Sequence, residues 1–244
     1  MQGNFEVPAE RQMNLTGSNG VMEIQNILTL SGTMELSATQ TLDNGTLKLN
    51  GGTLSVKNNV ATSSSIELSA DSNVVISSGS TLSHSGGALN IGTKNLTLSG
   101  GGTFTNLDNL VLNDAAGELE FAGDTATTVS HVKINSGDTA NMPVLRMTES
   151  GVIKNLTQQE FAEVNFVGGK TLTLEEAFAV PASKQMNISG AAGILKTASS
   201  ISLAGTLSVS AANPSLEGGT VALSGGTLKA DNDITVKSDL TSQA

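Results

Sequence analysis

The chain has 244 residues, with 12 basic and 22 acidic side chains, a formal net charge of −10, and no Cys, Trp or Tyr. No run of Lys or Arg could neutralise a series of phosphates, so nucleic acid and anionic membrane surfaces are disfavoured as partners. The longest apolar run covers residues 177–180, whereas a membrane span needs roughly 18 apolar residues, so we predict no membrane span.

The first 26 residues differ from the rest of the chain. They contain Pro8, the charged pair Glu10 and Arg11, and irregularly spaced apolar residues. Because proline is favoured in the first turn of a helix, this segment predicts a short helix from Pro8 through Met13. Solenoids need an atypical end over their first coil, so we predict that residues 1–26 form an N-terminal cap. The alternative is a disordered leader.

Residues 27–134 repeat a short motif of two apolar residues separated by one residue. Such a couplet is typical of a short strand with alternate side chains on one face, and the intervening Gly, Asn and Ser residues are typical of turns. Leu28, Leu47 and Ile66 each begin a couplet and follow one another at intervals of 19 residues. The pattern predicts an all-β fold, a single-stranded right-handed parallel β-helix (a β-solenoid) with three short strands in each coil of about 19–23 residues. The couplets begin at Leu28, Met34, Leu47, Leu54, Ile66, Val74, Leu89, Leu96, Leu110, Leu119 and Val132.

The regular spacing of the apolar couplets is interrupted between residues 137 and 163. Pro143 interrupts the pattern, and the segment from Thr157 to Glu160 matches a helix capping box ahead of Phe161. We therefore predict an irregular insertion here, with a short helix projecting from a corner. Because solenoids often place function in such insertions, Thr157, Glu160 and Phe161 are candidate interaction residues. The alternative is an irregular coil without a special role.

The couplets resume at Val164 and continue to the end of the chain, so we predict a β-helix over residues 27–244. The last 20 residues still carry the repeat. An uncovered strand edge attracts another strand. The sequence therefore predicts either that the natural protein continues or that copies associate end to end.

Asparagine follows three of the predicted strands, at Asn50, Asn113 and Asn135. In stacked coils, aligned Asn side chains can form a ladder of hydrogen bonds that satisfies corner backbone groups. We predict such a structural Asn ladder. The alternative is the ordinary preference of Asn for turns.

Paired carboxylates are the feature closest to a catalytic site. Glu118 and Glu120 flank Leu119 and are predicted to point outward together, and Asp231 and Asp233 have the same spacing. Exposed charge on a solvated face is the simpler interpretation. The lack of Trp and Tyr removes the usual sugar-stacking platforms, so we do not predict an enzyme.

Metal and cofactor chemistry finds little support in the sequence. Only His84 and His131 could supply imidazole ligands, and there is no Cys. Arg11 and Arg146, the residues suited to clamping a carboxylate, lie far apart in the sequence. We predict no catalytic, cofactor-binding or metal-binding residues, and no cofactor.

The recurring GGTL, SGT and NGTL elements, combined with the couplets, resemble the right-handed parallel β-helix of bacterial surface adhesins. Autotransporter passengers and filamentous-haemagglutinin-like exoproteins are the nearest analogues, and the resemblance covers residues 27–240. It implies an exported, elongated structural or binding module, located outside the cell or on the bacterial cell surface.

The sequence thus predicts a non-enzymatic extracellular structural and adhesive module whose partners are other protein or glycan surfaces. The first alternative is a filament subunit that forms a head-to-tail homopolymer, since two chemically different ends generate an open filament. The second is a polysaccharide-acting β-helix enzyme or a phage-type fibre.

Overall fold

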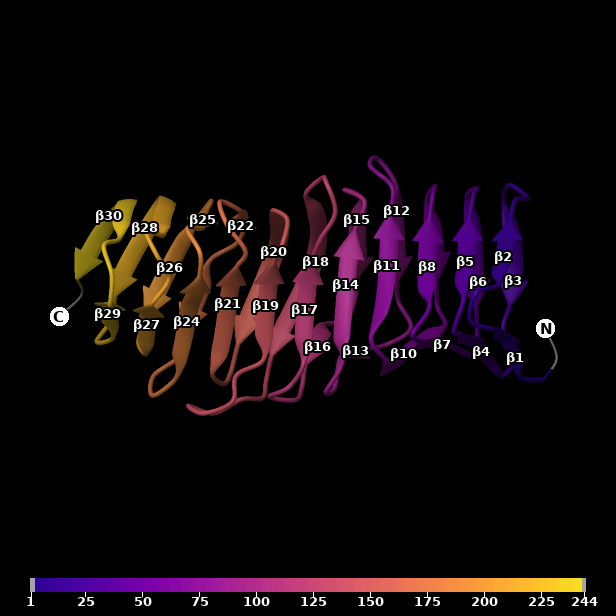
Figure 1. Cartoon of the computed structure of the whole chain (residues 1–244), viewed down its shortest axis with the longest axis horizontal. Helices are drawn as coiled ribbons and strands as arrows, with labels where there is room; N and C mark the ends of the chain where they lie inside the picture. The colour runs from indigo at the N-terminus through magenta and orange to yellow at the C-terminus, as the bar shows by residue number, and fades with distance from the viewer. Residues whose placement is uncertain (1–2, 243–244) are drawn as a thin grey trace.

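The computed structural model describes residues 3–242, which form thirty β-strands wound into a parallel β-solenoid (Figure 1). Strands of successive coils pair in parallel, and the two ends of the chain lie at opposite ends of the long axis (Figure 1). The predicted parallel β-helix with three strands per coil is therefore confirmed. No helix occurs within residues 3–242, and hence none that could span a membrane.

The first face of the solenoid is an 11-stranded sheet to which each coil contributes one strand, so the chain makes about 11 coils. Met13 pairs with Met34, and Met34 pairs with Leu54, which shows coils of about 20 residues stacked in register. The strands of this sheet are β2 (Gln12–Leu15), β5 (Thr33–Leu36), β8 (Thr53–Val56), β11 (Ser72–Ile76), β14 (Asn95–Ser99), β17 (Glu118–Phe121), β19 (Val144–Met147), β21 (Ala162–Phe166), β24 (Gln185–Gly190), β27 (Thr206–Val209) and β29 (Thr227–Ala230).

The second face begins with a four-stranded sheet, and it confirms the predicted 19-residue register. Leu28 pairs with Leu47, and Leu47 pairs with Ile66. This sheet ends at its fourth strand, β10, although further coils follow on the same face. Its strands are β1 (Phe5–Val7), β4 (Ile27–Leu30), β7 (Thr46–Asn50) and β10 (Ser65–Ala70).

The third face and the later part of the second face belong to one 15-stranded sheet, because some long strands turn the corner between the two faces. One of them, β18, pairs with β15 near its start and with β16 near its end. The strands are β3 (Gly20–Glu23), β6 (Gln40–Asp43), β9 (Val60–Thr62), β12 (Thr81–His84), β13 (Leu89–Asn90), β15 (Thr103–Asn106), β16 (Leu110–Leu112), β18 (Thr127–Ile134), β20 (Gly151–Gln158), β22 (Thr171–Leu174), β23 (Phe178–Val180), β25 (Ile194–Thr197), β26 (Ser200–Leu203), β28 (Ser215–Leu223) and β30 (Thr235–Ser242).

The interior is filled by the apolar couplets. Their side chains point inward from all three faces, and parallel stacking places each couplet against that of the next coil. The largest fully buried side chains include Phe104, Phe121 and Phe166. In the last coil the apolar side chains lose this cover, and Leu240 is 57% exposed. A narrow core of aliphatic residues and a few Phe rings therefore suffices for the fold.

The recurring Gly-Thr element has a packing reason. A Cβ atom at Gly32, Gly52 or Gly226 would lie 2.2 to 2.4 Å from a backbone oxygen of the preceding coil. No side chain fits at that distance, so glycine is required wherever two corners stack this closely. The following Thr begins a strand of the 11-stranded sheet in each case.

The short helix predicted from Pro8 through Met13 is wrong. Strands β1, β2 and β3 occupy this region and pair with β4, β5 and β6. Gln12–Leu15 alternates exposed and partly buried side chains, which is the period of a strand. The end of the solenoid is thus made by a first coil of strands. Residues 1 and 2 of the predicted cap, and residues 243 and 244, lie outside the described residues.

The short helix predicted near Phe161 is also wrong. Thr157 lies in strand β20, which pairs with β18 along most of its length. The irregularity is confined to residues 135–143, a loop between β18 and β19. Asp138 closes a turn in this loop, because its carboxylate accepts hydrogen bonds from the backbone of Ala140 and Asn141. The corner therefore absorbs the extra residues while the strands stay stacked.

Candidate binding face

The outer surface of the 11-stranded sheet carries polar side chains, because the residue between the two apolar members of each couplet points away from the core. Thr97, Glu120, Arg146, Asn165 and Ser189 occupy equivalent positions on five successive strands, from β14 to β24. We call these five residues the polar row. All of them are partly exposed. The row therefore presents an ordered polar surface across five coils.

Hydrogen bonds tie the start of the polar row to the carboxylate pair predicted from the sequence. Glu120 accepts from the hydroxyls of Thr97 at 3.3 Å and Thr148 at 2.9 Å. The Asn95 amide donates to Glu118 Oε1 at 2.9 Å and to Glu120 Oε2 at 3.4 Å. Both carboxylates thus have partners from neighbouring coils, which fixes their orientation on the sheet.

Arg146 joins the same cluster, which the sequence did not predict. Its Nη1 atom lies 4.0 Å from Glu118 Oε2, because β17 and β19 pair in register. Burial raises the pKa of Glu118; Arg146 opposes this rise, and the nearby carboxylates of Glu120 and Asp71 add to it. Because the Arg146 side chain is 43% exposed, we expect this ion pair to contribute little to stability.

A second cluster continues the polar row on β21 and β24. The Asn165 amide donates to Ser189 Oγ at 2.9 Å, and Ser189 Oγ donates to Glu163 Oε1 at 2.5 Å. Donors and acceptors therefore recur along the solenoid axis with the strand spacing of about 4.8 Å. An extended ligand rich in hydroxyl or amide groups would meet hydrogen-bonding groups at each step.

No hydrogen bond joins the side chains of the three asparagines of the predicted ladder to one another in the part of the chain that the structure describes. The Asn50 amide donates to Ser31 Oγ at 3.1 Å and accepts from Ser69 Oγ at 3.0 Å, which links three successive coils. Asn113 Oδ1 accepts a hydrogen bond from the backbone N–H of Gly92, in the neighbouring coil, at 2.8 Å. Asn135 follows in the next coil, yet no hydrogen bond joins its side chain to Asn113 in the described part of the chain. The short ladder at Asn50 is therefore built with serine.

Two of the predicted interaction residues meet at one corner. The Lys184 ammonium forms an ion pair with Glu160 and lies 5.5 Å from the centre of the Phe161 ring. Thr157 stands apart on β20, where its hydroxyl lies 3.4 Å from Asn155 Oδ1. The contacts of Glu160 and Phe161 link adjacent coils, so these side chains stabilise the stack at this corner.

A column of buried polar side chains lies inside the third face and was not predicted from the sequence. Thr62, His84 and Asn106 pair in register on β9, β12 and β15, and each is at most 2% exposed. His84 Nε2 lies 3.2 Å from the Ser64 carbonyl oxygen, and Asn106 binds the backbone of His131. The signal was present, because each residue replaces the second apolar member of a couplet.

We expect the buried imidazole of His84 to make the solenoid less stable in mild acid. Burial lowers the pKa of His84 below its usual value of 6.5. The unfolded chain therefore binds a proton more readily, and stability is lost as pH falls from about 6.5 toward the lowered pKa, with a slope of at most about 1.4 kcal/mol per pH unit. Thermal melts at pH 7.5 and 5.5 should show a smaller loss in His84→Gln than in wild type. Equal losses in both proteins would contradict this role.

No group of His, Asp and Glu that could hold a metal ion occurs between residues 3 and 242. No protein-family model, curated protein sequence or solved structure matches the chain.

Proposed function

We propose that this β-solenoid is a non-enzymatic structural and adhesive module that acts outside the cell or on a bacterial cell surface. Its polar row contacts glycan or protein surfaces along the axis of the rod. The observation that supports this proposal is the ordered line of hydrogen-bonding side chains from Thr97 to Ser189, held in place by bonds between coils.

The architecture favours a binding surface over a site for a single small molecule. The polar row follows a sheet in which every coil stacks on the next, so its side chains keep a fixed spacing. Many weak polar contacts at a regular spacing add up when the ligand is itself repetitive. A polysaccharide or an extended protein surface has this property, and the acidic net charge of −10 favours neutral or basic ligands over anionic ones.

The proposal is tested by binding to immobilised polysaccharides and extracellular-matrix proteins, measured by surface plasmon resonance. We expect binding to at least one surface of this panel. The double variant Thr97→Arg with Asn165→Arg places two long side chains on the polar row and should weaken that binding at least tenfold, since it blocks contacts on two of the five coils.

The matched control is the double variant Ser83→Arg with Thr173→Arg, which makes the same change of charge on the 15-stranded sheet. It should bind as wild type does. Equal weakening by both variants, or no binding to any surface of the panel, would overturn the proposal. Degradation of a polysaccharide that Glu118→Gln abolishes would favour the enzyme alternative, and sedimentation of long polymers would favour the filament.

A further inference from the structure

A groove of about 380 Å³ lies at the corner that leads into the 11-stranded sheet, beside the starts of β24, β27 and β29. The long loop between β18 and β19 helps to form it. A Cβ atom at Gly137 would lie 2.5 Å from the Phe161 carbonyl oxygen, so the loop packs against that corner, and Thr139 reaches the groove. The irregular insertion predicted from the sequence therefore helps to build a hollow that extends over the following coils.

The floor of the groove includes a straight row of outward side chains. Gln185 pairs with Thr206, and Thr206 pairs with Thr227, on three successive strands. Phe161 occupies the equivalent position one coil earlier, because the strand that follows it, β21, pairs with β24 in register. All four residues line the groove, and we call them the groove row. One aromatic ring and three polar side chains thus follow one another at the strand spacing of about 4.8 Å.

Three hydroxyls in the groove are free to bind a ligand. No hydrogen bond between residues 3 and 242 uses the hydroxyl of Ser183, Thr206 or Thr227, and all three residues line the groove and are at least partly exposed. Each hydroxyl can donate one hydrogen bond and accept two. Phe161 is partly exposed as well, so an apolar surface lies beside these polar groups.

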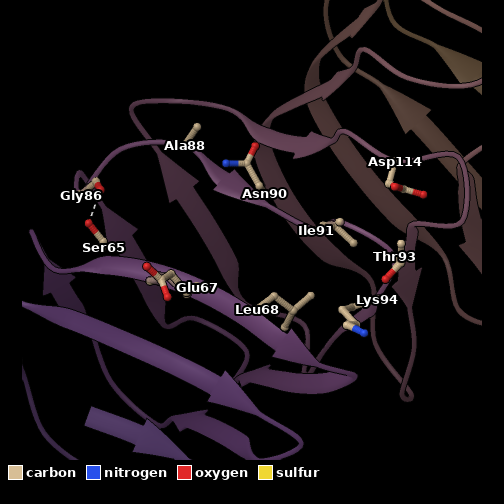
Figure 2. A pocket seen from close by; sticks show the side chains of 12 residues that line it. Ser65, Glu67, Leu68, Gly86, Ala88, Asn90, Ile91, Thr93, Lys94 and Asp114 are labelled. Carbon is tan, nitrogen blue, oxygen red and sulfur yellow. Dashed lines mark hydrogen bonds between the residues drawn. The ribbon is translucent and has the colours of Figure 1, made fainter. Parts of the chain in front are cut away.

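The groove carries little charge, although the chain is acidic. Among the residues that the structure describes, Lys184 is the one charged side chain that lines it, and Lys184 forms an ion pair with Glu160. The larger hollow on the second face, shown in Figure 2, is different, because Glu67, Lys94 and Asp114 line it. A charged ligand would find no unpaired partner in the groove, so its chemistry favours a neutral ligand.

We propose that this groove binds an extended neutral glycan of β-linked hexoses. A sugar ring has hydroxyls on its rim and an apolar face of C–H groups, which match the free hydroxyls and the ring of Phe161. A straight chain of sugars can follow the straight groove row and present the same groups at each step. The polar row takes no part in this site, so the inference does not rest on the proposed function, and the double variant Thr97→Arg with Asn165→Arg should leave binding in the groove unchanged.

The test titrates cellotetraose and chitotetraose, two neutral tetrasaccharides, into the isotope-labelled protein and follows the NMR signals of the backbone amides. At least one of them should bind with a dissociation constant of about 1 mM or below. Binding should shift the amide signals of Gly205 and Gly226, which lie in the groove. The signal of Gly52, which precedes β8 at the equivalent place of an earlier coil, should stay unchanged.

Two pairs of variants separate the groove from the fold. Thr206→Arg places a long side chain across the groove row and should weaken binding at least about fivefold. The matched control Thr53→Arg makes the same change at the start of β8, outside the groove, and should bind as wild type does. Phe161→Leu removes the ring but keeps a large apolar side chain, and it should weaken binding roughly threefold. Phe161→Tyr keeps the ring and should bind as wild type does.

Failure of both tetrasaccharides to bind, or equal weakening in Thr206→Arg and Thr53→Arg, would overturn the proposal. Binding that leaves the amide signals of Gly205 and Gly226 unchanged would also overturn it. An uncharged peptide, acetyl-Gly-Thr-Gly-Thr-Gly-amide, is titrated in parallel, and equally tight binding of this peptide would show that the groove does not select a glycan.

Discussion

Replacing Phe121 by alanine should lower the free energy of unfolding by about 3–5 kcal/mol. The Phe121 ring is fully buried and stacks between Leu98 and Met147 of the adjacent coils, so its removal leaves a cavity that three coils line. Urea unfolding followed by circular dichroism measures the loss. Leu107→Ala serves as the control because Leu107 is 75% exposed, and it should change stability by less than about 0.5 kcal/mol.

Gly151 allows a sharper test of the same packing. A Cβ atom at Gly151 would lie 2.5 Å from the Phe121 ring, so Gly151→Ala alone should cost about 1–3 kcal/mol through overpacking. Combined with Phe121→Ala, the new methyl group occupies part of the cavity. The double variant should therefore be more stable than the sum of the single effects predicts, by at least about 0.5 kcal/mol. Strict additivity would contradict the contact.

Gly52→Ala should destabilise the protein by about 3 kcal/mol, at the upper end of overpacking costs. The new Cβ would lie 2.4 Å from the Gly32 oxygen and 2.5 Å from the Leu30 oxygen. Both atoms belong to the backbone of the preceding coil, so they cannot move without disturbing the ladder between β5 and β8. Urea unfolding again measures the effect.

The neighbouring glycine supplies a matched control. Gly51 has a φ of +85°, and a Cβ atom there would meet nothing within 4 Å. Gly51→Ala therefore carries only the conformational cost of the left-handed region, about 1 kcal/mol, and Gly51→Asn should cost less because Asn tolerates this region better. If Gly51→Ala and Gly52→Ala proved equally destabilising, close stacking of the corners would not be the reason for the Gly-Thr element.

The fold could be predicted because its main determinant is local. A couplet such as Leu47 and Leu49 specifies a strand and its inner face, and a regular interval brings it onto Ile66 of the next coil. The two helices were predicted wrongly because local signals, Pro8 and the capping box near Glu160, gave way to pairing with neighbouring strands. Tertiary hydrogen bonding outweighs such weak propensities.

The candidate site was less predictable because it depends on the register between coils. Glu118 and Glu120 stand out in the sequence, but Arg146 joins them only because β17 pairs with β19 in register across a coil of unusual length. The missing ladder between β10 and β13 was likewise not predictable, because the couplets at Ile66 and Leu89 look like the others, and an equal interval of 23 residues, from Leu96 to Leu119, pairs in register.

Parallel pairing between adjacent coils also determines how the molecule responds to mechanical load. Strands hydrogen-bond to strands of the coils before and after them, so these bonds lie roughly along the axis of the rod. Tension applied between the two termini therefore separates one coil at a time, starting from an end of the solenoid, because each coil is held mainly by its immediate neighbours. A rod of this construction gives way in steps and dissipates force over many small ruptures.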